Sequence, residues 1–474
     1  MTCYAGFTII AYVCIAFGST IIIPASACEL NTTNSQQGYI AAGPLVGIIL
    51  GGVVGGYLGD KFGRRRVLLI ALITAAIING IASISVNWVM LMILQSIASF
   101  CAAGEYSLSM TILSESVPMA KRNLVVLLVT SIFLMAQGVM AVLAIPIIPL
   151  PFSNYISALD IYWNSWRTLL LVYSAPSLVS AAWLAFMLES PKYLFTQGRE
   201  EEALKIIRTI HRLNKGKSAG ELQITGLVTD AQQINGPASS KDQIVPLFKL
   251  PLVKYTIIVT ALHMFQQVGS FQIWLPTIAN QFIQIVETGE GTDKSLCAII
   301  NDSLEAPPNP DIAPCALNVV ALLMVLLVCV AQSVANALLS LIVNRVGRRN
   351  MAMGVTATCG LAGVLVNLVP NAYGSVAFFI IFLLGILVIG LYTAIAVALF
   401  PTQLRALAVA LTMTGGRIGT FASVQILNLM LVTNCNAGFY LFCAIFASSA
   451  IIAAFLPDDR RLQTQRKPEA KNTE

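Results

Sequence analysis

The sequence predicts an all-helical membrane protein with twelve transmembrane helices in two six-helix halves. Hydrophobic residues make up 57% of the chain and charged residues only 11%, whereas about a quarter of the residues in soluble domains are charged. Apolar runs long enough to cross a bilayer as helices, about 20 residues each, recur along the whole chain. One type of basic turn also occurs twice, which indicates a duplicated membrane domain.

The positive charges predict how the chain lies in the membrane. All but three of the 28 Lys and Arg fall in loops on one side, and the exceptions are Arg167, Lys294 and Arg417. The positive-inside rule makes that side cytoplasmic, so both termini are expected in the cytoplasm. The net charge of +6 is not arranged as a basic stripe with interleaved aromatics, so no nucleic-acid partner is expected.

Six apolar runs form the predicted N-terminal half, residues 1–188. The first run ends in Ala25-Ser26-Ala27, which resembles a signal-peptidase site. A secretory signal begins with positive charge, and none precedes Lys61, so we expect this run to remain as a span. The six runs lie near residues 4–25, 38–59, 67–86, 88–112, 123–149 and 167–188.

The turn between the second and third runs is the most distinctive stretch of this half. Its sequence, GGYLGDKFGRRR, holds a carboxylate, four basic residues and several glycines. Such a stretch cannot lie in hydrocarbon, so we predict a tight water-facing turn whose glycines let two helix ends approach. The carboxylate can pair with an arginine or complement a helix N-terminus. The residues concerned are Gly56, Gly59, Asp60, Gly63, Arg64 and Arg65.

Two elements recur at matched positions in both halves. The basic turn returns between the eighth and ninth runs as NRVGRRN, with Arg345, Gly347, Arg348 and Arg349. A proline with a nearby arginine follows the fourth and tenth runs, as Glu115, Pro118 and Arg122 and as Pro401 and Arg405. Proline ends a helix, and the arginine can bind exposed carbonyls or the glutamate. These elements are either helix stops with snorkelling charges or parts of a gate, and their matched positions favour a gate.

The most polar stretch, residues 189–253, is predicted to be a cytoplasmic linker. Residues Gly198–Asn214 place apolar side chains on one face with charges opposite, which predicts an amphipathic interfacial helix. Residues Gly220–Ser240 have the composition of a flexible linker. The C-terminal half, residues 254–457, has runs near 255–283, 317–343, 351–369, 374–400, 406–432 and 437–456, and a cytoplasmic tail follows at 458–474.

Two loops are predicted to face outside. They carry the glycosylation sequons at Asn31 and Asn301, and the two signals of charge and sequon agree. Cys297 and Cys315 lie in one exposed loop and either pair with each other or stay apart. Cys28 and Cys435 either pair across loops or stay free.

Three ionisable residues are predicted well inside the membrane, where the cost of charge makes each a functional hypothesis. Arg417 lies among glycines, so its guanidinium either faces a cavity and binds an anion or forms a structural pair. Glu105 lies nearer the inner end of its run and is expected to pair with the basic turns rather than to carry protons. His263 can titrate but is expected to be packed.

The seventh run is predicted to contribute most of the substrate pathway. It carries Gln266, Gln267, Gln272, Trp274 and Pro276. Amides and an indole around a proline kink suit a neutral or weakly polar organic solute, through hydrogen bonds and stacking.

These motifs resemble those of the major facilitator superfamily. The first basic turn matches the signature between the second and third spans of that family, and the proline elements resemble its Glu-x-x-Pro-x-x-x-Arg motif. The stretch beginning at Glu189, ESPKYL, resembles an element of the sugar porters and of their organic ion and synaptic vesicle relatives. The stretch WLPT from Trp274, with Arg417, is most similar to the synaptic vesicle glycoprotein and organic ion transporter branch. The resemblance implies transport by alternating access, with the basic turns latching the two halves in one state.

Three departures from the family pattern bear on function. Gln95 and Ser99 stand where relatives have an arginine and a nearby glycine, and Asn344 stands where an aspartate is usual. The loss of the intramembrane arginine and of one carboxylate of the basic turns puts ion coupling, and transport itself, in doubt. Such relatives also carry a polar segment before the first span, so the sequence is expected to be short at its start.

We therefore predict a transporter of a small organic solute, an organic ion or a sugar-like molecule, in the plasma membrane or a vesicle membrane. It is either a uniporter or a secondary active carrier with a coupling ion. The alternative is a transporter-shaped protein that no longer transports and serves as a binding or vesicle component. A channel is less favoured because no filter-like segment repeats. Two distant histidines give no metal or acid-base cluster, so neither an enzyme nor a cofactor is expected.

Overall fold

The computed structural model describes residues 2–117, 119–196, 198–215, 245–250, 252–266, 268–287, 292–305, 317–400 and 404–457. Within these ranges, nine helices are long and apolar enough to cross a membrane by length and composition. A helix or a pair of helices lies over each predicted apolar run. The expected flexible linker and the tail lie outside the described residues, apart from the helices at the start of the linker.

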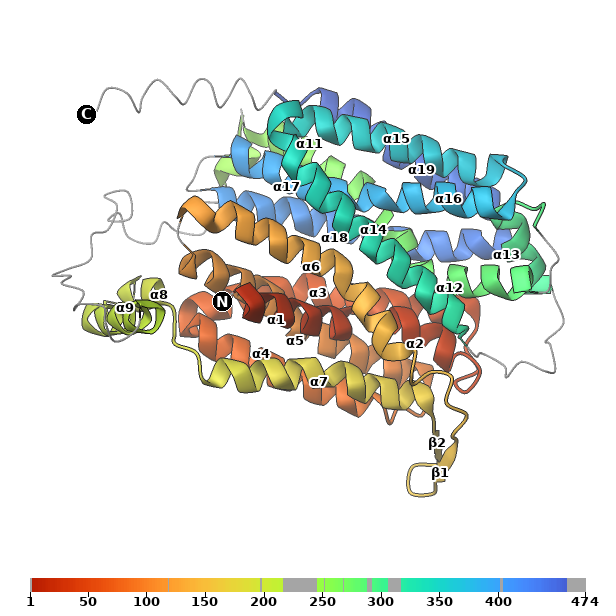
Figure 1. The fold of residues 1–474 in the computed structure, drawn as a ribbon, viewed down its shortest axis with the longest axis horizontal. Coiled ribbons are helices and arrows are strands. Elements are labelled where there is room, and N and C mark those ends of the chain that lie inside the picture. The colour runs from red at the N-terminus through yellow and green to blue at the C-terminus, as the bar shows by residue number, and fades with distance from the viewer. Residues whose placement is uncertain are drawn as a thin grey trace.

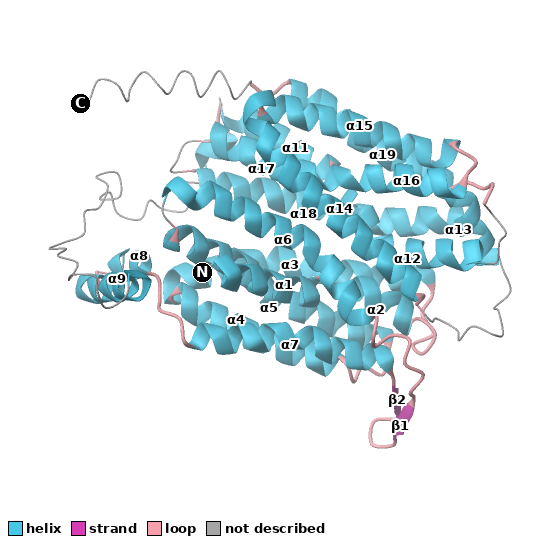
Figure 2. Ribbon diagram, in the orientation of Figure 1, coloured by secondary structure: helices cyan, strands magenta, loops and turns pink. Residues whose placement is uncertain are grey.

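The N-terminal half occupies one side of the molecule, coloured red to yellow in Figure 1. The first apolar run is divided into two helices by a bend at Phe17 and Gly18. The helices of this half are α1 (Thr2–Ala16), α2 (Ser19–Ser26), α3 (Asn34–Phe62), α4 (Arg64–Ala82), α5 (Trp88–Ser116), α6 (Met119–Ala144) and α7 (Ser165–Ala185). Two short strands, β1 (Asn154–Ile156) and β2 (Ile161–Trp163), form an antiparallel hairpin before α7 (Figure 2).

The C-terminal half, green to blue in Figure 1, packs beside the first. Its tenth predicted run is helical throughout but passes through a 3₁₀ segment in the middle. The helices are α11 (Leu252–Phe265), α12 (Val268–Glu287), α13 (Leu296–Glu305), α14 (Val319–Val346), α15 (Arg348–Leu368), α16 (Ala372–Leu383), η3 (Leu384–Leu387), α17 (Val388–Leu399), α18 (Arg405–Thr433) and α19 (Cys435–Ala454). In the sequence, the segment that links the two halves contains α8 (Pro191–Thr196), α9 (Glu200–Lys215) and η2 (Val245–Phe248).

Helix α9 lies over most of the stretch that was predicted to form an amphipathic helix. It begins with three glutamates in its first turn, where negative charge complements the helix N-terminus. Its buried Ala203 packs with Tyr193 and Leu194 of α8. The apolar face is therefore partly covered by the neighbouring short helix.

The two basic turns have the same backbone conformation. Gly63 joins α3 to α4 with φ +101°, and Gly347 joins α14 to α15 with φ +87°. Each glycine N–H donates to a carbonyl of the helix that it ends, Gly59 O at 3.2 Å and Val343 O at 2.9 Å. Such φ values strain any residue with a Cβ. We call the end of the bundle that holds these glycines the turn end, and the opposite end, which holds β1, β2 and α13, the hairpin end.

Close packing of α3 against α5 depends on glycines spaced four residues apart. A Cβ at Gly47 would lie 2.1 Å from Ser96 O, and a Cβ at Gly51 would lie 2.0 Å from Phe100 O. Gly55 meets Gly104 in the same way. In hydrocarbon, where no hydrophobic force drives helices together, such close backbone approach supplies the attraction.

A buried arginine holds the hairpin end of the N-terminal half together. Arg167 is fully buried and its Nη2 lies 2.6 Å from Glu29 Oε1. The guanidinium also donates to Ser83 O at 2.6 Å and Ser85 O at 2.9 Å. Glu29 in turn accepts from the Trp166 indole at 2.7 Å. Nearly every strong polar group of this pair is used, as a buried ion pair requires.

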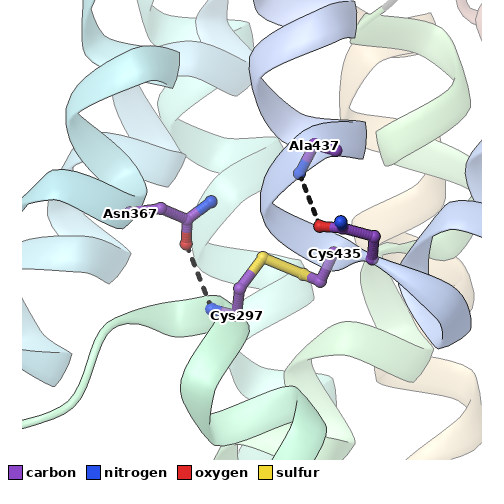
Figure 3. Close-up of a disulfide and its surroundings, with 5 residues drawn as sticks. Cys297, Asn367, Cys435 and Ala437 are labelled. Carbon is purple, nitrogen blue, oxygen red and sulfur yellow. Dashed lines mark hydrogen bonds between the residues drawn. A yellow bond between two sulfur atoms is a disulfide. The ribbon is translucent and has the colours of Figure 1, made fainter.

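The expected pairing of Cys297 with Cys315 is wrong. Cys297, in α13, forms a disulfide with Cys435 at the start of α19, with 5.5 Å between the Cα atoms (Figure 3). Asn367 Oδ1 accepts from the Cys297 N–H at 3.1 Å and so fixes this end of α13. Cys28 is also disulfide-bonded, and Cys315 lies outside the described residues. The partners are set by which helix ends meet in space, and loop proximity in the sequence does not reveal that.

The shared turn geometry predicts the effect of a methyl group at Gly63. A Cβ there would lie 3.0 Å from Glu189 Oε2 and would occupy a positive φ, which costs about 1–3 kcal/mol. Gly63→Ala is therefore expected to lower the detergent melting temperature. Gly56→Ala is the matched control, because a Cβ at that helical position meets nothing within 4 Å. Equal melting temperatures for the two variants would contradict the turn geometry.

Candidate functional site

The two halves are joined at the hairpin end by side-chain amides of α18. Gln425 Nε2 donates to Gly38 O at 2.9 Å, and Asn428 Nδ2 donates to Asn34 O at 2.6 Å. Both acceptors lie in the first turns of α3. These bonds hold the hairpin ends of α3 and α18 together.

A second contact between the halves runs along α6 and α14. Ser333 Oγ donates to Ser131 O at 3.1 Å, and Asn336 Nδ2 donates to Ser131 Oγ at 3.0 Å. Gly138 allows the two helices to approach, since a Cβ there would lie 3.0 Å from Cys329 Cβ. These residues lie near the middles of their helices.

Three glutamines form a polar cluster between the halves near the same depth. Gln272 Nε2 of α12 donates to Gln137 Oε1 of α6 at 2.7 Å. Gln137 Nε2 donates back to Gln272 O at 3.2 Å. Gln332 Nε2 of α14 donates to Gln272 Oε1 at 2.9 Å and to Leu383 O at 3.1 Å. The Gln272 amide therefore bonds to both halves at once. We call Gln137, Gln272 and Gln332 the glutamine cluster.

Two members of this cluster, Gln137 and Gln332, were not predicted from the sequence. Inside the membrane the cost of charge singles out ionisable side chains, and a neutral amide does not carry that cost. Gln137 and Gln332 are 8% and 1% exposed. Each is the single glutamine of a long apolar run, and that was the available signal.

The other predicted residues of the seventh run face their own half. Gln266 is buried and its Nε2 donates to Gly385 O of η3 at 3.2 Å. Trp274 is buried and its Nε1 donates to Val424 O of α18 at 3.4 Å. Gln267 lies outside the described residues. Of the three described pathway candidates in this run, only Gln272 reaches across to the other half.

Arg417 extends from α18 towards the N-terminal half. Its Nη1 lies 3.1 Å from the position that a Cβ on Gly52 of α3 would take. Tyr12 of α1 and Tyr106 of α5, whose ring centroids are 5.5 Å apart, lie within electrostatic range of the guanidinium. Within the described ranges, Arg417 makes neither a hydrogen bond nor an ion pair. A partly buried guanidinium with open donors is a ready site for an anion.

An apolar cavity lies between the helices that carry Tyr12 and Gln137. It has a volume of about 330 Å³ and is lined by α1 and α6. The lining residues are Cys3, Gly6, Phe7, Ile10, Ile132, Met135 and Val139. Both the size and the lining suit the apolar part of a small organic molecule.

The first basic turn binds the end of α7 and the segment after it. The Arg65 guanidinium donates to Leu184 O at 3.3 Å and Ala185 O at 2.7 Å, and its backbone N–H donates to Glu189 Oε1 at 3.1 Å. Arg64 lies 5.1 Å from the ring centroid of Tyr193. The structure thus brings Gly63, Arg64, Arg65 and Glu189 together.

The second basic turn repeats this arrangement in the C-terminal half. Arg349 donates to Ala454 O at the end of α19, and Arg348 donates to Ala394 O of α17 at 3.0 Å. In both halves the arginine two residues after the turn glycine, Arg65 or Arg349, therefore binds exposed carbonyls where the last helix ends. These described contacts run within each half. The side chains of Asp60, Glu115, Arg122, Asn344 and Arg405 lie outside the described part of the chain.

The expected pairing of Glu105 with the basic turns is wrong. Glu105 is fully buried, and neither carboxylate oxygen has a hydrogen-bond partner. Its electrostatic neighbours are Tyr4, Tyr12 and Cys14 of α1. The side chain lies inside the N-terminal bundle because its face of α5 is turned to α1 rather than to the turn end.

His263 and Gln95 are packed within their own halves. His263 Nδ1 lies 2.9 Å from Val259 O, and its ring contacts Tyr392 edge to face. Gln95 Nε2 donates to Asn79 Oδ1 at 2.7 Å, and Asn79 Nδ2 donates to Leu170 O at 2.9 Å. A neutral network therefore occupies the place where relatives are expected to carry an arginine.

Comparison with known proteins agrees with this architecture. The chain matches the Major Facilitator Superfamily over residues 8–288. The inward open conformation of the xylose transporter XylE from E. coli superposes with a TM-score of 0.65, covering 98% of both chains at 16% identity. This likeness shows the fold and confirms the predicted all-helical membrane architecture, while the count of twelve spans stays a prediction.

Curated relatives include members of the branch that the motifs resembled. Solute carrier family 22 member 7 of Sus scrofa is 28% identical over 248 residues, which is 50% of this chain and 40% of the relative. Synaptic vesicle glycoprotein 2B of Rattus norvegicus is 27% identical over 199 residues, or 42% and 29%. Solute carrier family 22 member 6 of Rattus norvegicus is 21% identical over 422 residues, or 87% and 66%. The matched stretches thus span less than two thirds of each of these relatives.

The profile match covers more than half of the chain, and the fold, the paired turns and the relatives all agree with it. The chain is a multi-pass membrane protein rather than an enzyme, and it belongs to the Major Facilitator Superfamily.

Proposed function

We propose that the protein carries a small organic solute across a membrane by alternating access between its two halves. The observation that carries this proposal is the glutamine cluster, in which one amide bonds to both halves near the middle of the bundle. Amide hydrogen bonds can be exchanged for bonds to a solute at little net cost, because each exchange conserves the number of bonds. A polar site on the boundary between two rigid bodies is where alternating access places the solute.

Arg417 and the apolar cavity support the chemistry that we propose for this solute. The unpaired guanidinium favours a negatively charged group, to which arginine donates two parallel hydrogen bonds. The cavity between α1 and α6 favours an apolar body. The substrate class that satisfies both is a small organic anion.

The hydrogen bonds at the hairpin end support a state closed at that end. Gln425 and Asn428 bind α3 there, so we expect solute to enter from the turn end. Opening the hairpin end requires these two bonds to break. The arginines of the basic turns would stiffen each half, so that the halves move as units.

The orientation follows from charge. Because basic residues gather at the turn end, that end and both termini face the cytoplasm, and Asn31 and Asn301 face outside as glycosylation sites. The plasma membrane or a vesicle membrane fits this arrangement.

Uptake into proteoliposomes tests the function. Purified protein is reconstituted and assayed with radiolabelled benzoate, D-xylose and tetraethylammonium, which represent an organic anion, a sugar and an organic cation. Saturable uptake of benzoate above protein-free vesicles is expected, with little uptake of the other two. Sustained absence of flux for all three by folded protein would instead support the non-transporting alternative.

Loss of the Arg417 charge is expected to weaken anion binding. A hydrogen bond to a charged group contributes about 1.5–3 kcal/mol, so Arg417→Gln should raise the KM for benzoate by roughly tenfold to a hundredfold. Lys294→Gln is the control, because Lys294 is exposed and pairs with Asp302 in the outer loop. A KM that is unchanged in Arg417→Gln would remove Arg417 from the pathway.

The glutamine cluster predicts different outcomes for two glutamines of the seventh run. Gln272→Leu removes the side-chain amide that Gln137 and Gln332 share, so uptake should fall at least tenfold. Gln266→Leu removes one bond within the C-terminal half, so it should lower the melting temperature with uptake per folded molecule nearly unchanged. Equal losses of uptake in the two variants would contradict a pathway role specific to Gln272.

A further inference from the structure

Glu105 is a fully buried carboxyl group that the proposed pathway does not use. Both of its oxygens lack a hydrogen-bond partner. A carboxylate without a partner in a protein interior within hydrocarbon is strongly unfavourable, whereas the protonated carboxyl is a neutral polar group. The burial and the missing partners therefore indicate that the side chain carries a proton in this state.

Among the described residues, the groups that face Glu105 offer no compensating charge. They are Tyr4, Tyr12 and Cys14 from α1, and Cys101 from its own helix. None of these neighbours is a cation. On α3 and α4, which also pack against α5, glycine and alanine meet the adjacent Gly104.

Two further unpaired hydroxyls lie near this carboxyl on the side towards the turn end. Ser109 follows Glu105 by one helical turn on the same face of α5, and its hydroxyl is buried without a partner. The Tyr4 hydroxyl, near the start of α1, is also buried without a partner. These hydroxyls place polar groups between the turn end and Glu105.

Tyr12 connects Glu105 electrostatically to the proposed anion site. Tyr12 lies within electrostatic range of both Glu105 and Arg417, and its ring packs on Tyr106. An anion bound at Arg417 brings negative charge close to Tyr12, which itself neighbours Glu105, and nearby negative charge disfavours ionisation of a carboxyl group. Anion binding thus favours proton binding, and by linkage proton binding favours anion binding.

We propose that Glu105 is a proton-binding site that couples proton entry to entry of an organic anion at Arg417. The proton from water forms the O–H bond of the Glu105 carboxyl, and the same bond breaks when the proton leaves to water on the other side of the membrane. One proton and one anionic group then cross together. The coupling rests on the proposed transport function, but the proton-binding site does not.

Infrared titration of the purified full-length protein tests the site without any transport assay. The carbonyl band of a protonated carboxyl should be present at neutral pH, disappear only at alkaline pH, and be absent in Glu105→Gln. Glu202→Gln, which changes an exposed glutamate paired with Arg199, should retain the band. Added benzoate should move the loss of the band to higher pH. A band that is absent at neutral pH, or that persists in Glu105→Gln, would overturn the proposal.

Proteoliposome uptake then tests the coupling. An inward proton gradient should raise wild-type benzoate uptake at least threefold, and an uncoupler should remove this increase. Glu105→Gln, which mimics the protonated state, should lose the response to the gradient while retaining benzoate exchange. Active uptake that ignores the gradient would overturn the coupling. An intact carboxyl band without any uptake would contradict the proposed function while supporting the proton site.

Discussion

Polar groups inside this protein must find their partners within the protein, because hydrocarbon offers none. The structure satisfies this constraint in three places that differ in chemistry. Arg167 and Glu29 use nearly all of their donors and acceptors on one another and on nearby carbonyls. Gln95 and Asn79 form a neutral chain within the N-terminal bundle. The glutamine cluster is the only one of the three that spans both halves, so it is the one whose bonds a moving boundary must break.

The two halves are stiffened by the same device. A glycine with positive φ ends one helix and starts the next, and the arginine two residues later binds the last carbonyls of the final helix in its half. Each half is thus closed on itself at the turn end, in the way that a rigid-body motion of two units requires. At the hairpin end, by contrast, the described amide bonds of α18 run between the halves.

Arg417 and Glu105 differ from these groups, because neither has a polar partner among the described residues. One is a cation at the boundary between the halves and the other is a carboxyl inside the N-terminal bundle, and neither has a partner in the described part of the chain. Tyr12 lies within range of both. A charge kept without a partner in a membrane is costly, which is why these two positions carry the functional proposals.

The sequence alone determined the fold class, the helix positions and the matched turns, because hydrophobic run length, loop charge and glycine placement are local properties. It also predicted Arg417 from the cost of a charge inside an apolar run, and Gln272 as an amide close to a proline kink. Only the tertiary structure decided which residues meet. Cys297 pairs with Cys435, Glu105 faces α1 rather than a basic turn, and Gln137 and Gln332 join Gln272, because helix rotation and packing bring together positions far apart in the chain.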